Sequence, residues 1–520
     1  AAAAGSSSAD GAAAAAAGGD DGVTASTEFH FVSECFFLAL RSLRIALVPI
    51  TRRAERYAHD LARRSKVAPL HPSAGAAAAT EALTTLKMAG LGPMQHSVLA
   101  YRAMLEGDEL QSLLLRFLSL TAAWLLTLGE QPDAARAFAL LPEACVTDVC
   151  ELLVLSARSP ARERLSRDPA AAAIVSRFCC DWLGRRQLLA SPFVRYAMSE
   201  VLSTLVEADA LQRGGGGGFG GHGMRLFDLI DAPAAERVQA PLMGLYVELG
   251  LHTKADAVTD KNGQRYAIMR VLRKLWEMPP VWRQLQALAA ASASASPSGQ
   301  EAMLLGDFAT TLVKEKIFLL DDALGRLADV KTRQDEMADE AAWKAQPARQ
   351  RADREKRLEQ VKRTAKGFLE LAKASLRAML HLTADADVIV AFTGVPARAR
   401  KLANLLGEFL KKLCGPECQS LRVKEGEKLG WQPKQMLTDT TELLLNCTRQ
   451  PGFVDYLRDA DSVESAILAK AHHILKEKIG NFPPLKLDAL GAVIGQLQQA
   501  EGGGAAGGGG GGGAGGGAGG

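Results

Sequence analysis

The chain has 520 residues, of which 48% are hydrophobic and 23% are charged, so it can bury one long core or several domain cores. Its formal net charge of +3 is small for this length and argues against a nucleic-acid binder and against an acidic tail. The 8 cysteines lie in apolar runs without regular spacing, which favours buried cytosolic thiols over a disulfide framework.

Several segments have low-complexity composition. Residues 1–26 are mostly Ala, Gly, Ser and Asp, without the cationic start and apolar centre of a signal peptide. We therefore expect a disordered tail on a fragment or partial gene model. Similar composition predicts insertions near 67–80, 213–223 and 289–299, and a disordered glycine-rich tail at 501–520. The glycine run near 213–223 lacks the preceding strand and the Gly-Lys-Ser/Thr ending of a phosphate-binding loop.

Ordered structure is expected from residue 27 onward. The run 29–48 is too apolar for a surface helix and is followed by Pro49, which predicts a buried helix opening a stacked array. A basic helix follows at 52–66. The charge-free stretch 117–129 is shorter than the roughly 20 residues that a membrane span needs, so we expect a buried helix and no membrane insertion.

Apolar residues at helical spacing continue through the middle of the chain. Asp321 and Asp322 are adjacent there, but consecutive helix residues point about 100° apart and cannot act on one substrate, so a solvated edge is expected. The predicted helices cover 114–128, 141–155 (apolar at 146, 149, 152 and 153), 193–205, 241–249, 265–277 and 306–327 (apolar at 317, 320, 324 and 327).

The densest charge run, 351–363, raises the question of nucleic-acid contact. No aromatic residues are interleaved for base stacking. The spacing predicts i,i+4 pairs of Asp353 with Arg357 and of Glu359 with Arg363, typical of a solvent-exposed helix. We expect this helix to become apolar and buried over 368–382.

A distinctive stretch runs from 402 to 433. Six apolar residues between Leu402 and Leu413 share one helix face, and the helix is predicted to end at Gly415 and Pro416 after two lysines. The connection that follows carries four apolar anchors among charges and glycines, which predicts an ordered segment. The anchors are Leu421, Val423, Leu429 and Trp431.

Residues with catalytic or metal-binding chemistry are sparse. Cys414 and Cys418 could be two metal ligands, but no second Cys or His pair has matching spacing, and Cys447 or the pair His472 and His473 would have to be recruited by the fold. A Cys–His nucleophilic arrangement meets the same objection. We expect packed thiols, histidines near a helix end, and no catalytic, cofactor-binding or metal-ligating residue.

Strand and hairpin signals are scarce, and long helices are joined by proline or glycine. The sequence therefore predicts an all-α fold, an elongated irregular armadillo-like helical solenoid, although no fixed repeat length is evident. Such arrays expose extended surfaces and usually bind proteins.

Several blocks of the chain resemble the core of the ubiquitin conjugation (chain elongation) factors of the U-box type. The resemblance runs in one collinear order over residues 28–480, which a chance motif would not do. The blocks are 31–38, 141–143, 191–195, 265–268 with 275–276, 318–324 and, most specific, 413–424 with 427–434.

The resemblance implies a core domain at 27–480, followed by a short linker or helix at 481–500. It also implies extension of ubiquitin chains on already ubiquitinated substrates for proteasomal degradation, with catalysis by positioning a ubiquitin-conjugating enzyme and client. The implied partners are the AAA segregase ATPase, ubiquitin and ubiquitinated substrates, and proteasome shuttle proteins, in the cytoplasm and nucleus. No nucleic acid, membrane or cofactor is expected.

Complete members of that family carry a C-terminal U-box, which recruits the conjugating enzyme. After Gly480 this chain shows no U-box pattern of paired Asp-Pro dipeptides, so residues 1–520 alone are expected to be inactive. Two other classes of function remain open. One is a non-catalytic solenoid adaptor for the segregase ATPase or ubiquitinated clients, and the other is an unrelated armadillo-like transport or scaffold protein.

Overall fold

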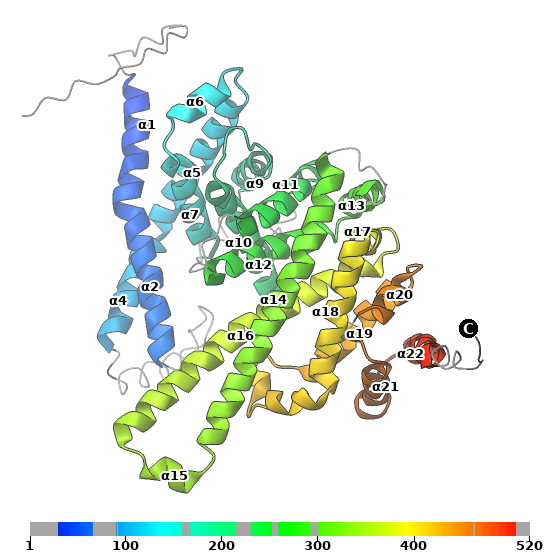
Figure 1. Ribbon diagram of the computed structural model, residues 1–520. Coiled ribbons are helices and arrows are strands. Elements are labelled where there is room, and N and C mark those ends of the chain that lie inside the picture. Colours follow the sequence, from blue (N-terminus) through cyan, green and yellow to red (C-terminus); the bar gives the residue numbers. More distant parts are fainter. Residues whose placement is uncertain are drawn as a thin grey trace, which may run out of the picture.

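The computed structural model describes residues 30–65, 90, 92–158, 165, 168–214, 230–251, 258–292, 300–460 and 463–505. Over this part of the chain the fold is all-α, without a strand, and helices stack one after another roughly in chain order (Figure 1). Buried apolar side chains form one continuous core from Leu47 to Leu497. The predicted all-α helical solenoid is confirmed.

The predicted low-complexity segments fall mostly where the structure gives no description. Residues 1–26, 67–80, 215–223, 293–299 and 506–520 lie outside the described residues.

The first helices form one nearly continuous rod, seen in blue in Figure 1: α1 (Phe31–Ser42), the π-helical segment η1 (Leu43–Leu47) and α2 (Val48–Ser65). Pro49 therefore does not end the rod. It lies in the first turn of α2, where a missing N–H costs little, and the wide π turn carries the chain into it.

The prediction that the run 29–48 forms a buried helix is wrong. Phe31 is 74% exposed and Ile45 is 65% exposed, and in the described part of this run only Leu40, Leu47 and Val48 are buried. This rod lies at the edge of the array, and the described helices cover it on one side only (Figure 1). On that side Phe36 contacts Phe117 and Trp124, with ring centroids 5.6 and 5.1 Å apart.

Helix α4 (Gly92–Leu105) packs on α2, and α5 (Asp108–Gly129) follows it. Helix α5 is longer than the apolar stretch 117–129, because Leu114, Leu115 and their neighbours belong to the same helix. By length and composition it is the one described helix that could cross a membrane, and 44% of its apolar stretch is buried inside the protein. A core helix has the same properties, and α5 packs on α7 (Ala144–Arg158) and α9 (Pro169–Leu183).

The next layer contains α6 (Ala134–Leu140), α7, α9 and α10 (Pro192–Gly214). The stripe predicted for 141–155 is confirmed, since Val146, Val149, Leu152 and Leu153 are all buried in α7. Sequence chemistry fixes the start of α9, where the Asp168 carboxylate accepts the Ala171 N–H at 3.0 Å.

Three helices follow: α11 (Ala232–Leu251), α12 (Val258–Leu275) and α13 (Pro279–Ser292). Helix α13 corrects the predicted linker at 289–299, because residues 289–292 form its last turn and Ala289 is fully buried. Prolines are favourable at the first positions of a helix, so Pro279 and Pro280, which follow α12, form the start of α13.

The two longest helices, α14 (Gln300–Glu336) and α16 (Ala348–Ala384), pack antiparallel and are joined through the short α15 (Glu340–Ala345). Their connected ends project from the array as an arm with α15 at its tip (Figure 1). The far halves of both helices enter the core, as predicted for 368–382.

The C-terminal part packs against α14 and α16 on one side of this hairpin (Figure 1). Its last helix runs to Ala505, beyond the segment 481–500 that the sequence suggests. The elements are α17 (Val390–Thr393), α18 (Pro396–Cys414), the 3-10 helices η4 (Pro416–Leu421) and η5 (Gly426–Leu429), α19 (Pro433–Thr448), α20 (Phe453–Arg458), α21 (Ser465–His473), the π-helical η6 (Ile474–Ile479) and α22 (Pro484–Ala505).

Candidate functional site

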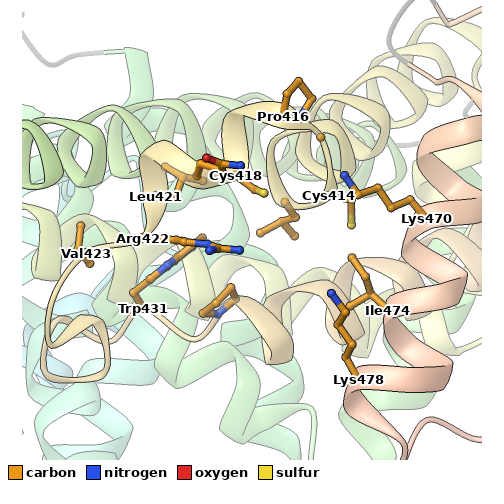
Figure 2. A pocket seen from close by; sticks show the side chains of 14 residues that line it. Cys414, Pro416, Cys418, Leu421, Arg422, Val423, Trp431, Lys470, Ile474 and Lys478 are labelled. Carbon is orange, nitrogen blue, oxygen red and sulfur yellow. The ribbon is translucent and has the colours of Figure 1, made fainter.

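The stretch from α18 to α19 borders a groove of about 590 Å³, which we call the basic groove. Figure 2 shows Arg422 reaching into it from the segment after η4, and Lys470 and Lys478 from the helix opposite. All three cations are exposed, whereas Leu421, Trp431 and Cys414 are buried and form its floor. Its other lining residues are Leu413, Gly415, Pro416, Cys418, Gln419, Val423, Pro433 and Ile474.

The helix end at the groove follows from local sequence. The Gly415 N–H donates to the Lys411 carbonyl at 2.6 Å, and Pro416 then begins η4. Gly415 has an extended backbone, so glycine is required there by space, because a Cβ would collide with the Lys411 carbonyl oxygen. The predicted helix stop is confirmed.

The connection between η4 and α19 is ordered, as predicted, and α14 holds it. The side-chain amide of Gln334 accepts the Lys424 N–H at 2.8 Å and donates to the Lys424 carbonyl at 3.3 Å. Gly430, with φ +80°, lets the chain turn so that Trp431 inserts with 6% of its surface exposed. The groove wall is therefore fixed by contacts 90 residues apart in sequence.

The enclosed thiols of Cys414 and Cys447 are poor nucleophiles. Burial raises the pKa of Cys414 to about 11, and burial also raises the pKa of the fully enclosed Cys447, so both are protonated at neutral pH. Cys418 is half-buried, and His472 and His473 lie at the end of α21, as expected from the sequence. Among the described residues no three His, Cys, Asp or Glu side chains are placed to hold a metal ion.

The adjacent acids Asp321 and Asp322 diverge, as the helical geometry predicts. Asp321 pairs with Lys412 of α18, whereas Asp322 receives a hydrogen bond from Arg326 at 2.7 Å. They do not form a shared carboxylate site.

The charged arm is exposed, but its pairing differs from the prediction. Glu359 pairs with Lys362 at 2.8 Å instead of Arg363, and Arg354 lies 3.8 Å from Glu336 across the hairpin. The pair of Asp353 with Arg357 is not formed in the described structure. Long charged side chains on an exposed helix can pair with the i,i+3 residue or with a residue of the adjacent helix. Sequence spacing alone does not show which of these pairs forms.

Two buried arginines were not singled out from the sequence, although they lie in the blocks 191–195 and 265–268. Arg195 pairs with Glu248, joining α10 to α11, and burial lowers its pKa to about 10. Arg265 lies 3.1 Å from Glu315 and joins α12 to α14. The sequence signal that could have revealed them is an arginine among apolar residues of a predicted helix.

Lys316 is a second group that the sequence did not reveal. It is 1% exposed in α14, donates to the Ala372 carbonyl, and its ammonium lies 5.8 Å from the ring centroid of Phe409. Burial lowers its pKa to about 7. A lysine with this pKa can serve as a base elsewhere, but here it is enclosed by α14, α16 and α18.

These observations define a helical solenoid whose described residues form a groove and charged surfaces. The chain belongs to the ubiquitin elongating factor core family, whose model matches residues 5–498. The match extends beyond the resemblance over 28–480 at both ends.

Curated relatives carry corresponding names. The probable ubiquitin conjugation factor E4 of Arabidopsis thaliana is 25% identical over 443 residues, covering 82% of this chain and 40% of that protein. E4 ubiquitin-protein ligase UFD2 of Saccharomyces cerevisiae is 28% identical over 252 residues, 48% of this chain and 25% of that protein. Ubiquitin conjugation factor E4 of Schizosaccharomyces pombe is 23% identical over 395 residues, 72% of this chain and 36% of that protein. The chain thus spans less than half the length of each of these relatives.

Proposed function

We propose that the chain is the core of a ubiquitin chain elongation factor, which extends ubiquitin chains on already ubiquitinated substrates for proteasomal degradation. The family match over residues 5–498 carries this proposal. The relatives named ubiquitin conjugation factor and ubiquitin-protein ligase support it.

The core's part in the reaction would be positioning. Its described residues present no metal cluster, and the thiols of Cys414 and Cys447 are held protonated by burial. A stacked array can instead hold a charged conjugating enzyme and an acceptor lysine near each other, which raises their effective concentration. Binding to the AAA segregase ATPase and to shuttle proteins, in cytoplasm and nucleus, is part of the same proposal.

Chain elongation can be tested by reconstitution. Residues 1–520 are compared with the same chain fused to the U-box of a relative, using activating enzyme, conjugating enzyme, ubiquitin and a substrate that already bears ubiquitin. We expect no elongation from residues 1–520 alone and elongation from the fusion.

The isolated U-box is the matched control, because it recruits the conjugating enzyme without the solenoid. Robust elongation by residues 1–520 alone would contradict the positioning role. Client binding by a fusion that does not elongate chains would favour a non-catalytic adaptor.

A further inference from the structure

The basic groove contains three cations and no acidic side chain in its lining. Lys470 and Lys478 are eight residues apart on the continuous helix formed by α21 and η6, with Ile474 between them, and Arg422 faces them (Figure 2). None of the three forms an ion pair within the described residues. The nearby Lys411 and Lys412, in contrast, pair with Glu464 and Asp321.

The floor of the groove is apolar and buried. Leu421 and Trp431 are each 6% exposed, and the reciprocal Gln334 contact fixes the wall behind them. A volume of about 590 Å³ holds a few side chains and is within the usual range for ligand sites. A ligand that fits both parts would carry an apolar group for the floor and negative charges for the rim.

We propose that the basic groove binds a short acidic segment of a partner protein, with one apolar side chain inserted against Trp431 and flanking carboxylates paired with the rim cations. Arg422 can bind a carboxylate through two parallel hydrogen bonds, whereas the lysines act as point charges. An extended peptide satisfies all three cations because carboxylates recur along it. This inference concerns binding and is independent of whether residues 1–520 elongate ubiquitin chains.

The probes are three fluorescein-labelled short peptides of Asp and Glu that differ only in their central residue, which is Leu, Phe or Trp. Binding to the full chain is followed by fluorescence anisotropy. We expect at least one peptide to bind, and its amide counterpart, with Asn and Gln in place of the acids, to bind at least about tenfold more weakly. Affinity should also fall as salt is raised, because exposed charges are screened.

Charge reversal locates the site. The double variant Arg422→Glu, Lys478→Glu should weaken peptide binding by at least about tenfold, because both changes place like charges against the ligand. Lys476→Glu is the matched control, since Lys476 is exposed on the same η6 helix but does not line the groove, and it should stay within about twofold of wild type. Circular dichroism melting confirms that the variants are folded, which is expected because all three positions are exposed.

The proposal is overturned if none of the three peptides binds, if the amide peptide binds equally well, or if the double variant and Lys476→Glu behave alike. A competition arm separates a peptide site from a site for small anions. Displacement of the bound peptide by equimolar inorganic phosphate would assign the groove to a free phosphate and contradict a peptide ligand.

Discussion

At the residue scale, Lys316 is the clearest case of an ionisable side chain whose charged form is disfavoured by burial. Its stem fills core volume among three helices while its ammonium has a backbone carbonyl and an aromatic ring as close contacts. The carboxyl group of Asp439 raises the pKa of Lys316, but by less than burial lowers it. Burial in turn raises the pKa of Asp439. The structure therefore keeps a lysine where holding the proton is costly.

This gives a pH-dependent stability with a defined sign. Because the folded pKa is about 7 and the ordinary value is 10.5, the unfolded state binds more protons between these values, so stability rises with pH across this window. In Lys316→Met we expect that rise to be absent, with wild type gaining about 1 kcal/mol per pH unit relative to the variant from pH 7 to about 8.5. Urea unfolding at several pH values measures it.

Lys314→Met is the control, because Lys314 is exposed two residues away on the same helix. The buried cysteines have raised pKa values and therefore lower the stability as pH rises further. Their contribution is the same in wild type and variants, so it cancels in the comparison. Parallel stability curves for wild type and Lys316→Met would refute the role of this lysine.

At the element scale, the arm formed by α14, α15 and α16 has a thin core. Within 351–363, Leu358 is the only buried side chain, at 7% exposure, and the ion pairs around it are exposed. Exposed ion pairs contribute roughly 0–1 kcal/mol each, so the apolar contact decides whether the arm stays closed.

Leu358→Ala should destabilise the arm locally by about 2–3 kcal/mol, since it removes buried methyl groups and leaves a cavity near the surface. Hydrogen exchange followed by mass spectrometry should show faster exchange over 328–336 and 348–363, with little change in α18 and α19. Arg357→Ala, which alters the exposed neighbour, should leave exchange unchanged. Equal protection of the arm in wild type and Leu358→Ala would contradict this view.

At the scale of the whole molecule, buried ion pairs connect successive helix layers. The Arg265 guanidinium donates to the Tyr246 carbonyl at 3.0 Å and lies 4.8 Å from the centroid of the Tyr246 ring. It also pairs with Glu315, so this one side chain joins α12, α11 and α14. The Tyr246 hydroxyl also donates to Glu315, and burial raises the pKa of Tyr246.

Arg265→Met should destabilise the protein by about 3–5 kcal/mol, because it leaves the Glu315 carboxylate buried without its cation. The double variant Arg265→Met, Glu315→Met should recover part of that loss, since it removes the stranded charge. Thermal and urea unfolding of the single and double variants measure the coupling. A double variant no more stable than Arg265→Met would show that the ion pair is not the cause.

The sequence by itself determined the fold class, because helical spacing of apolar residues is a local property that survives in any all-α packing. It also determined the family resemblance and the stop at Gly415, since a helix end depends on residues close together in the chain. The apolar character of Trp431 and its neighbours predicted an ordered segment, but the contact with Gln334 that holds this segment comes from a distant helix. Thus the floor of the basic groove could be anticipated, although not the groove itself.

Only the tertiary structure decided which faces of those helices are covered and which charges meet. Most side chains of 30–46 proved exposed because this rod lies at the edge of the array, where no described helix covers its outer side, and no local pattern encodes that position. Likewise, Lys470 and Lys478 face Arg422 across about 50 residues of chain, and Lys316 is buried by helices α16 and α18. Burial and charge proximity are set by contacts between distant segments, and these contacts determine what the surface can bind.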